Sequence, residues 1–444
     1  LHPLQNLAEM EAIYTKAKSN RGILEISGCM ESQKAHLIYG LSGLFTSHLI
    51  LAEDEKAAKE LYEDYRFYDK NVYYYPAKDL LFFQADIHGN LLIRQRMRVI
   101  KALLEQKENI TVVTSIDGCM DYLQPLDKIE KQLIHFRNDS TLDMDKLKDA
   151  LVHMGYERVG QVEMPGQFSI RGGIVDIYSL TEENPWRIEL WGDEIDSIRT
   201  FDSQSQRSLE NLDEITIYPA TEQPAEKGGV SFLDYFAEKN SLVFLDEPNR
   251  LEENARAVEE EFRQSCENRQ QKGEENISQN WMCRWGDLNH KLNNRNCISV
   301  SLMEPKRADW KITEQFNLTV KSMSSYQSSF ELLVKDLRQY KKQGYQIVLL
   351  SGSRTRAERL AKDLQDEGLS AFYGQDFDRV LEPGEIMVAY GHARKGFEYP
   401  FIKFAIITET DIFGKEQKKH KKKKEYNGKR IQDFSELSIG DFVV

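Results

Sequence analysis

Helical and strand patterns alternate along the first 125 residues, and this alternation constrains the fold more than any other feature of the sequence. Residues 4–18 form a helical stripe, and two further helices are expected at residues 55–68 and 90–105. Short apolar runs typical of strands occur at residues 22–26, 37–39, 49–52, 72–75 and 110–114. Strands that alternate with helices predict a parallel sheet with helices on both faces.

The pattern changes near residue 141. After a helix expected at residues 142–154, closely spaced β-rich runs occur at residues 159–163, 167–171, 173–178, 186–191, 194–202 and 215–218. Strands separated by turn residues predict a mostly antiparallel sheet in a separate domain. A buried run at residues 242–245 returns to the first pattern, and a small α/β unit begins near residue 323. A chain of 444 residues is also too long for one core, so we expect three or four domains.

Composition excludes several classes of protein. The five cysteines are scattered without a C-x-x-C pair, which indicates reduced thiols and neither a disulfide framework nor a zinc site. The apolar runs are too short for a transmembrane helix. The net charge is −13, although residues 411–430 carry eight Lys and one Arg against three carboxylates. The rest of the chain is therefore too acidic to be a general nucleic-acid binder.

A segment resembling a phosphate-binding loop reads Gly40-Leu41-Ser42-Gly43-Leu44-Phe45-Thr46-Ser47. The P-loop pattern requires a second glycine where Phe45 stands and a lysine where Thr46 stands. We expect the apolar run at residues 37–39 to be the strand that enters this loop. Without the lysine charge and the glycine backbone, the loop is predicted to be a degenerate nucleotide site.

Asp246 and Glu247 end a buried run, as the Mg²⁺-binding and water-positioning carboxylates of nucleotide hydrolases do. Acidic residues also commonly end buried strands. Because the predicted loop lacks its lysine, we expect these two residues to complete the degenerate site without catalysis.

The run from Lys418 to Lys424 has two readings. It could contact nucleic-acid backbone weakly, or it could be an extended, self-repelling linker. The run is interrupted only by His420 and has no interleaved aromatic residues for base stacking, so the linker is favoured.

Arg158 and Arg171 lie on neighbouring predicted strands, close to Phe168. Arginines beside an exposed aromatic residue are enriched at protein interfaces. The alternative is an ordinary solvated strand face.

The chain resembles the N-terminal region of the bacterial transcription-repair coupling factors, the Mfd family, whose first domains resemble the repair helicase UvrB. The matching stretches are Gly40-Leu41-Ser42-Gly43 and residues 165–178, 187–206, 245–248, 407–414 and 435–444. Together they cover essentially the whole chain in the order of the family.

This resemblance implies an α/β fold in which a degenerate RecA-like parallel-sheet domain is split by an inserted, mostly antiparallel α+β domain and followed by a small α/β domain. The expected parts are residues 1–125 and 219–320 for the RecA-like domain and 126–218 for the inserted UvrA-binding domain. Residues 321–410 would form the small domain, 411–434 a basic linker, and 435–444 the start of the RNA-polymerase-interacting domain.

The resemblance further implies a non-catalytic, cytoplasmic region that recruits UvrA to stalled RNA polymerase during nucleotide excision repair. Arg158 and Arg171 match arginine positions used for UvrA in the family, with Phe168 beside them, whereas Ser169 replaces a third arginine. No metal or cofactor is expected in this chain, since ATP and Mg²⁺ belong to motor domains that the family carries farther along. A C-terminal domain of the family is expected to cover the UvrA-binding surface, so this chain should bind UvrA constitutively. A residual UvrB-type ATPase or a DNA-binding module remains the alternative.

Overall fold

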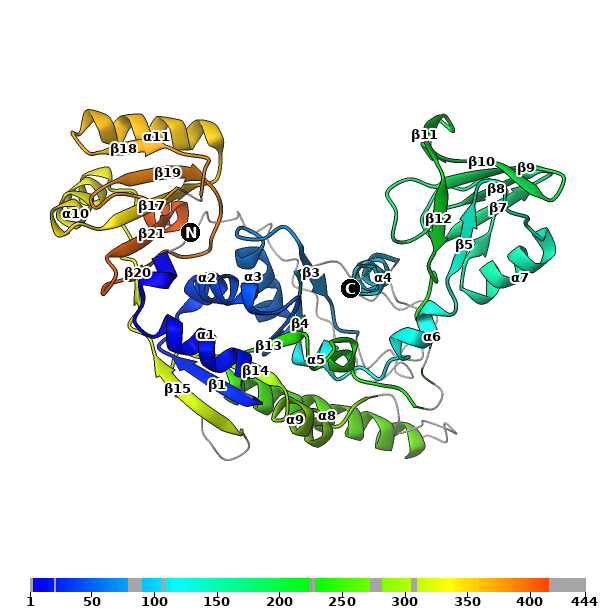
Figure 1. Cartoon of the computed structure of the whole chain (residues 1–444), viewed down its shortest axis with the longest axis horizontal. Coiled ribbons are helices and arrows are strands. Elements are labelled where there is room, and N and C mark those ends of the chain that lie inside the picture. Colours follow the sequence, from blue (N-terminus) through cyan, green and yellow to red (C-terminus); the bar gives the residue numbers. More distant parts are fainter. Residues whose placement is uncertain are drawn as a thin grey trace.

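The computed structural model describes residues 3–19, 21–78, 90–105, 109–223, 225, 228–271, 282–304, 310–377 and 379–414. Figure 1 shows three units in a row: a central parallel-sheet unit, an inserted unit with antiparallel strands at one end (cyan to green), and a smaller α/β unit at the other (yellow to orange). This arrangement confirms the predicted fold class. The exact domain boundaries stay a prediction.

The central unit is built on seven strands that pair in parallel in the order β15-β1-β14-β13-β2-β4-β3. They are β1 (Gly22–Ser27), β2 (Ser47–Ala52), β3 (Val72–Tyr75), β4 (Ile110–Ser115), β13 (Ser241–Asp246), β14 (Asn296–Val300) and β15 (Ile312–Asn317). Segments from both sides of the inserted unit therefore share one sheet. Because the strands are parallel, the loops after β1 and β13 leave the same edge.

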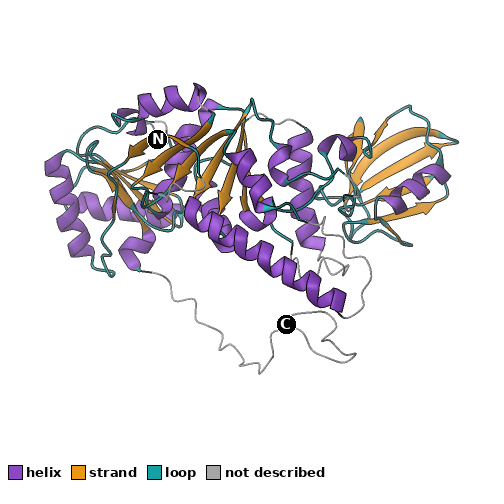
Figure 2. Ribbon diagram, turned by 90° about the horizontal axis from the view of Figure 1, so that it is seen from below, coloured by secondary structure: helices purple, strands orange, loops and turns teal. Residues whose placement is uncertain are grey.

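Helices cover both faces of this sheet, as the alternating pattern predicts (Figure 2). One face packs on α1 (Met10–Ser19), α2 (Glu31–Leu41) and α3 (Glu55–Tyr65). The other face packs on α4 (Asn90–Leu104), α5 (Ile116–Cys119), α8 (Pro248–Gln271) and α9 (Trp285–Leu292). Successive strand residues alternate between the two cores, since side chains along a strand point to opposite faces.

One predicted strand is wrong. Residues 37–39 lie inside α2, where Leu37, Ile38 and Leu41 are fully buried. A helix buried on most of its surface carries a continuous apolar run, which periodicity alone cannot distinguish from a short strand.

The inserted unit carries six strands in the order β11-β10-β9-β8-β7-β6, all antiparallel except the β6–β7 pair. They are β6 (Glu157–Arg158), β7 (Gln167–Arg171), β8 (Ile174–Ile177), β9 (Trp186–Trp191), β10 (Glu194–Phe201) and β11 (Ser208–Leu212). The helix α7 (Met144–His153) contributes Leu147 and Leu151 to the core. A separate pair, β5 (Ile134–Arg137) with β12 (Glu214–Ile217), joins the entry and exit of this unit, and α6 (Leu126–Glu130) precedes β5.

The third unit has a mixed six-stranded sheet in the order β16-β20-β21-β17-β19-β18. Its elements are β16 (Lys321–Ser322), α10 (Phe330–Gln343), β17 (Gln346–Ser351), α11 (Arg354–Asp366), β18 (Ala371–Tyr373), β19 (Ile386–Tyr390), β20 (Phe397–Tyr399), β21 (Phe404–Thr408) and α12 (Glu409–Phe413). One face of this sheet packs on α10, α11 and α12. The opposite face belongs to the same hydrophobic core as α1, α2 and α3, so the third unit is packed against the central one.

Two predictions fall outside the described residues: the basic run from Lys418 to Lys424 and the start of a further domain at residues 435–444. Within the described residues, no helix has the length and apolar character needed to cross a membrane.

Candidate functional site

The segment from Gly40 to Ser47 does not lie where a phosphate-binding loop would lie, so the prediction that it is a degenerate nucleotide site is wrong. Gly40 lies in the last turn of α2, and Gly43, Phe45 and Thr46 lie in the connection that leads into β2 at Ser47. A P-loop instead leads from a strand into a helix. Ser47 pairs with Ser241 at the start of β13, roughly 16 Å along the strand from Asp246 at its end. The segment and Asp246 thus lie at opposite edges of the sheet.

The connection with the correct geometry follows β1 and opens α2. It reads Gly28-Cys29-Met30-Glu31-Ser32-Gln33-Lys34-Ala35, which keeps the first glycine and the lysine of the pattern. Gly28 has φ +77°, and a Cβ there would lie 2.0 Å from the Leu318 carbonyl oxygen, so only glycine fits. Gln33 replaces the second glycine, and Ala35 replaces the Ser or Thr that would contact Mg²⁺.

Lys34 is bound to the two carboxylates of the predicted site. Its Nζ lies 2.6 Å from Asp246 Oδ1 and 2.6 Å from Glu247 Oε1. Ile26 and Asp246 both pair with Val300, so the end of β1 and the end of β13 lie at one edge of the sheet. Lys34 follows β1 and therefore lies at the same edge as the two carboxylates. Burial alone lowers the pKa of Lys34, but the two carboxylates outweigh it and raise the pKa above its ordinary value. The group is therefore a charged ammonium held between two acids.

A nucleotide with Mg²⁺ does not fit these residues. Gln33 fills the position of the second glycine, and Ala35 lacks the hydroxyl that would contact Mg²⁺. The lysine and the two carboxylates that would serve phosphate and metal are paired with one another. Among the described residues, no cluster of three or more His, Cys, Asp or Glu side chains could hold a metal ion. Sequence reasoning missed Lys34 even though its signal was present: Gly28 follows the apolar run at residues 22–26 after a single serine, and a lysine stands six positions later.

Arg158 and Arg171 lie near the β6 edge of the inserted sheet. Arg158 is exposed on β6, the last strand of the sheet, and pairs in register with Phe168. Arg171 lies three positions beyond Phe168 on β7, and side chains alternate along a strand, so the two arginines leave the sheet on opposite faces. A partner that contacts both arginines must therefore reach both faces of the sheet around the edge strand β6.

Arg171 is held in place by a buried acid. Its Nη2 lies 2.6 Å from Asp176 Oδ2, while half of its side chain stays exposed. Asp176 is fully buried and also accepts from Arg187, at 2.7 Å to Nε and 2.9 Å to Nη2. Because Arg187 keeps the acid paired on its own, the exposed part of Arg171 is free to contact a partner.

The prediction that Phe168 forms part of the contact surface is wrong. Its side chain is fully buried, in the same core as Leu147 and Leu151 of α7. It sits on the inner face of β7, where alternation places every second residue toward the helix. Ser169, at the position of the third family arginine, is also buried and donates to the Gly160 carbonyl at 3.0 Å.

The structure adds an aromatic residue that the sequence reasoning did not single out. Trp191 ends β9 with 83% of its surface exposed. It lies four positions after Arg187, which faces Asp176 across the β8–β9 pair, so Trp191 shares the sheet face of Arg171. Exposed Trp and Arg side chains are the residues that most often dominate binding energy.

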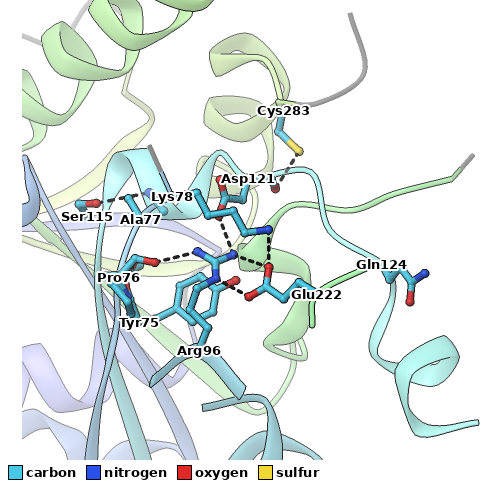
Figure 3. A network of polar contacts seen from close by, with 12 residues as sticks. Tyr75, Pro76, Ala77, Lys78, Arg96, Ser115, Asp121, Gln124, Glu222 and Cys283 are labelled. Carbon is cyan, nitrogen blue, oxygen red and sulfur yellow. Dashed lines mark hydrogen bonds and ion pairs between the residues drawn. The ribbon is translucent and has the colours of Figure 1, made fainter. Parts of the chain in front are cut away.

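A buried ionic network lies where the inserted unit joins the central one (Figure 3). The guanidinium of Arg96, on α4, is completely buried and binds Glu222 in a fork; its Nη2 also lies 2.7 Å from Asp121 Oδ2. Lys78 binds Glu222 as well, and the Arg96 guanidinium lies 4.1 Å from the centre of the Tyr75 ring. Two cations thus balance two acids in a water-poor joint between the units.

This network predicts a pH dependence of stability. Burial alone raises the pKa of Glu222, but Arg96 and Lys78 outweigh it and lower the pKa to about 2. The contribution is complete above the ordinary glutamate pKa and is lost as the pH falls from about 5 to 2. We expect Glu222→Gln to destabilise the chain at pH 7, and the difference in unfolding free energy from wild type to narrow by about 2–3 kcal/mol across this window. Urea unfolding of both proteins between pH 7 and 2.5 measures this difference. A difference that does not change with pH would contradict the lowered pKa of Glu222.

Comparison with known proteins finds a family model that matches the inserted unit. Residues 134–222 match the family model of the UvrB interaction domain. This range contains β6, β7, β8 and β9, with Arg158, Arg171 and Trp191.

Much longer stretches of the chain are similar to transcription-repair-coupling factors. The protein from Bacillus subtilis (strain 168) is 30% identical over 497 aligned positions, which cover 94% of this chain and 42% of that protein. Those from Staphylococcus haemolyticus (strain JCSC1435) and Staphylococcus epidermidis (strain ATCC 35984) are 26% and 25% identical, covering 84% and 85% of this chain and 36% and 37% of theirs. The chain spans less than half the length of these relatives. These matches confirm the resemblance to the transcription-repair coupling factors.

Proposed function

We propose that this chain is a non-catalytic recruitment region of a bacterial transcription-repair coupling factor. It binds UvrA and thereby brings nucleotide excision repair to stalled RNA polymerase in the cytoplasm. The match of residues 134–222 to the UvrB interaction domain carries this proposal. The similarity to transcription-repair-coupling factors over most of the chain supplies the context.

The β6 edge of the inserted sheet is the proposed contact surface for UvrA. Arg158 and Arg171 supply charges on the two sides of that edge, and Trp191 supplies a large apolar contact on the side of Arg171. Phe168 supports the surface from inside the core. A short edge strand also leaves backbone groups open to pairing by a partner.

The alternative of a residual ATPase is disfavoured by the ion pairs of Lys34 with Asp246 and Glu247. The alternative of DNA binding through the run from Lys418 to Lys424 predicts an affinity that falls steeply with salt. Contact with RNA polymerase would belong to the domain expected to begin near residue 435.

A competition experiment tests the proposal. The chain and UvrB should compete for UvrA, because each carries a UvrB-type interaction domain. We expect the chain to co-elute with UvrA in gel filtration and an excess of UvrB to displace it. Arg137→Ala, an exposed change on β5 at 77% side-chain exposure, serves as a control that keeps binding. A chain that elutes apart from UvrA at micromolar concentration would contradict the proposal.

A further inference from the structure

The site around Lys34 shows backbone strain at two residues. Glu247 follows β13 with φ +53°, and Glu31 opens α2 with φ +20°. Non-glycine residues in this region of backbone space are costly and persist where surrounding contacts enforce them. Glu247 is held by three contacts: its Oε1 binds Lys34 Nζ and accepts from the Leu302 amide at 2.9 Å, and its own amide donates to the Val300 carbonyl at 3.1 Å. The strained backbone of Glu247 is thus held by contacts that include the Lys34 ammonium.

The third unit covers the first turns of α2, next to Lys34. Gln33 Nε2 donates to Tyr399 Oη at 2.9 Å, and the Lys395 amide donates to Ser32 Oγ at 3.1 Å. The side chain of Tyr399 is fully buried. In folds that bind nucleotides, this helix terminus is where phosphate approaches. Here groups of the same chain occupy that approach.

A second set of contacts fixes this cover to α3. Arg394, in the loop after β19, donates through its amide to Asp64 Oδ1 at 3.0 Å and through Nε to Asp64 Oδ2 at 2.9 Å. Arg394 also binds Glu60, and Ser32 Oγ donates to Asp64 Oδ2 at 2.9 Å. Asp64 is almost completely buried, so α2, α3 and the third unit share one polar joint.

We infer that the Lys34 ammonium is a built-in counter-ion that takes the place of a divalent cation between Asp246 and Glu247, and that the third unit seals it in. The third unit thereby gains a role that its sequence did not reveal. The inference concerns a different unit from the UvrA-binding surface, so either can fail without the other.

The test is to remove the ammonium and supply a metal. In Lys34→Ala, a buried acid loses its partner, so we expect the thermal midpoint to fall by roughly 5–10 °C. Millimolar Mn²⁺ or Mg²⁺ should recover several degrees in this variant, because two carboxylates and the vacated space favour a small divalent cation. Wild type should show no such recovery. Lys16→Ala, which removes an exposed lysine paired with Glu314, is the matched control without either effect.

A double variant covers the case in which Lys34→Ala fails to fold. Lys34→Ala with Asp246→Asn removes the unpaired charge, so we expect it to fold and to lose the response to metal. The inference would be overturned if Mn²⁺ raised the thermal midpoint of Lys34→Ala no more than that of wild type. It would also be overturned if Mn²⁺ raised the midpoint of the double variant as much as that of Lys34→Ala. Gain of nucleotide binding is not required, since Gln33 and Ala35 still replace the residues that would contact phosphate and metal.

Discussion

Replacing Arg96 by Met is expected to destabilise the chain by about 3–5 kcal/mol, because it leaves two buried acids without their principal cation. Glu222 loses the fork of Arg96, and Asp121 loses a partner at 2.7 Å. Methionine approximates the length of the arginine stem, so packing loss is small and the unpaired charge dominates. Lys78 still binds Glu222, which keeps the effect below that of a fully isolated charge.

The effect should appear as a lower urea midpoint for the chain. Gln95→Ala changes an exposed neighbour on the same helix and should shift stability by no more than about 0.5 kcal/mol. Lowering the pH toward 3 should narrow the gap between Arg96→Met and wild type, because protonated acids no longer need the cation. A midpoint equal to that of Gln95→Ala would show that the network adds nothing to stability.

The fold could be predicted largely from the alternation of patterns, because that alternation reports which faces are buried. The runs that became β1, β3 and β4 each follow a predicted helix, and the closely spaced turn residues predicted the antiparallel unit. The run at residues 37–39 could not be predicted in the same way. It lies in a helix that packs on the central sheet with one side and on the third unit with the other. Because both sides are buried, the run is apolar without a helical period.

The candidate site was predicted less completely than the fold. Asp246 was identified correctly as the end of a buried strand, but its partner was sought at Thr46, in a connection at the wrong edge of the sheet. Lys34 stands six positions after Gly28 in the sequence, but its pairing with Asp246 follows only from the register that brings β1 and β13 to one edge. Phe168 shows the converse error. The exposed Arg171 follows three positions later on the same strand, and Arg158 pairs with Phe168 across β6, yet strand alternation turns the ring of Phe168 into the core.

Changing Arg158 and Arg171 together to Ala is expected to weaken the UvrA complex by at least about 2 kcal/mol, which is roughly 30-fold in Kd. The fold should survive both changes. Arg158 is exposed on an edge strand, and Asp176 remains paired with Arg187 when Arg171 is removed. The two arginines leave opposite faces of the sheet, so each single change should give part of the loss, and the two losses should be nearly additive.

Titration calorimetry of UvrA into the Arg158→Ala/Arg171→Ala chain tests whether UvrA binds at the β6 edge. We expect the affinity of the double variant to be at least about 30-fold weaker than that of wild type, the affinity of Arg137→Ala to be unchanged, and all three proteins to share one thermal midpoint. An affinity for the double variant equal to that of wild type would contradict the assignment of UvrA binding to the β6 edge.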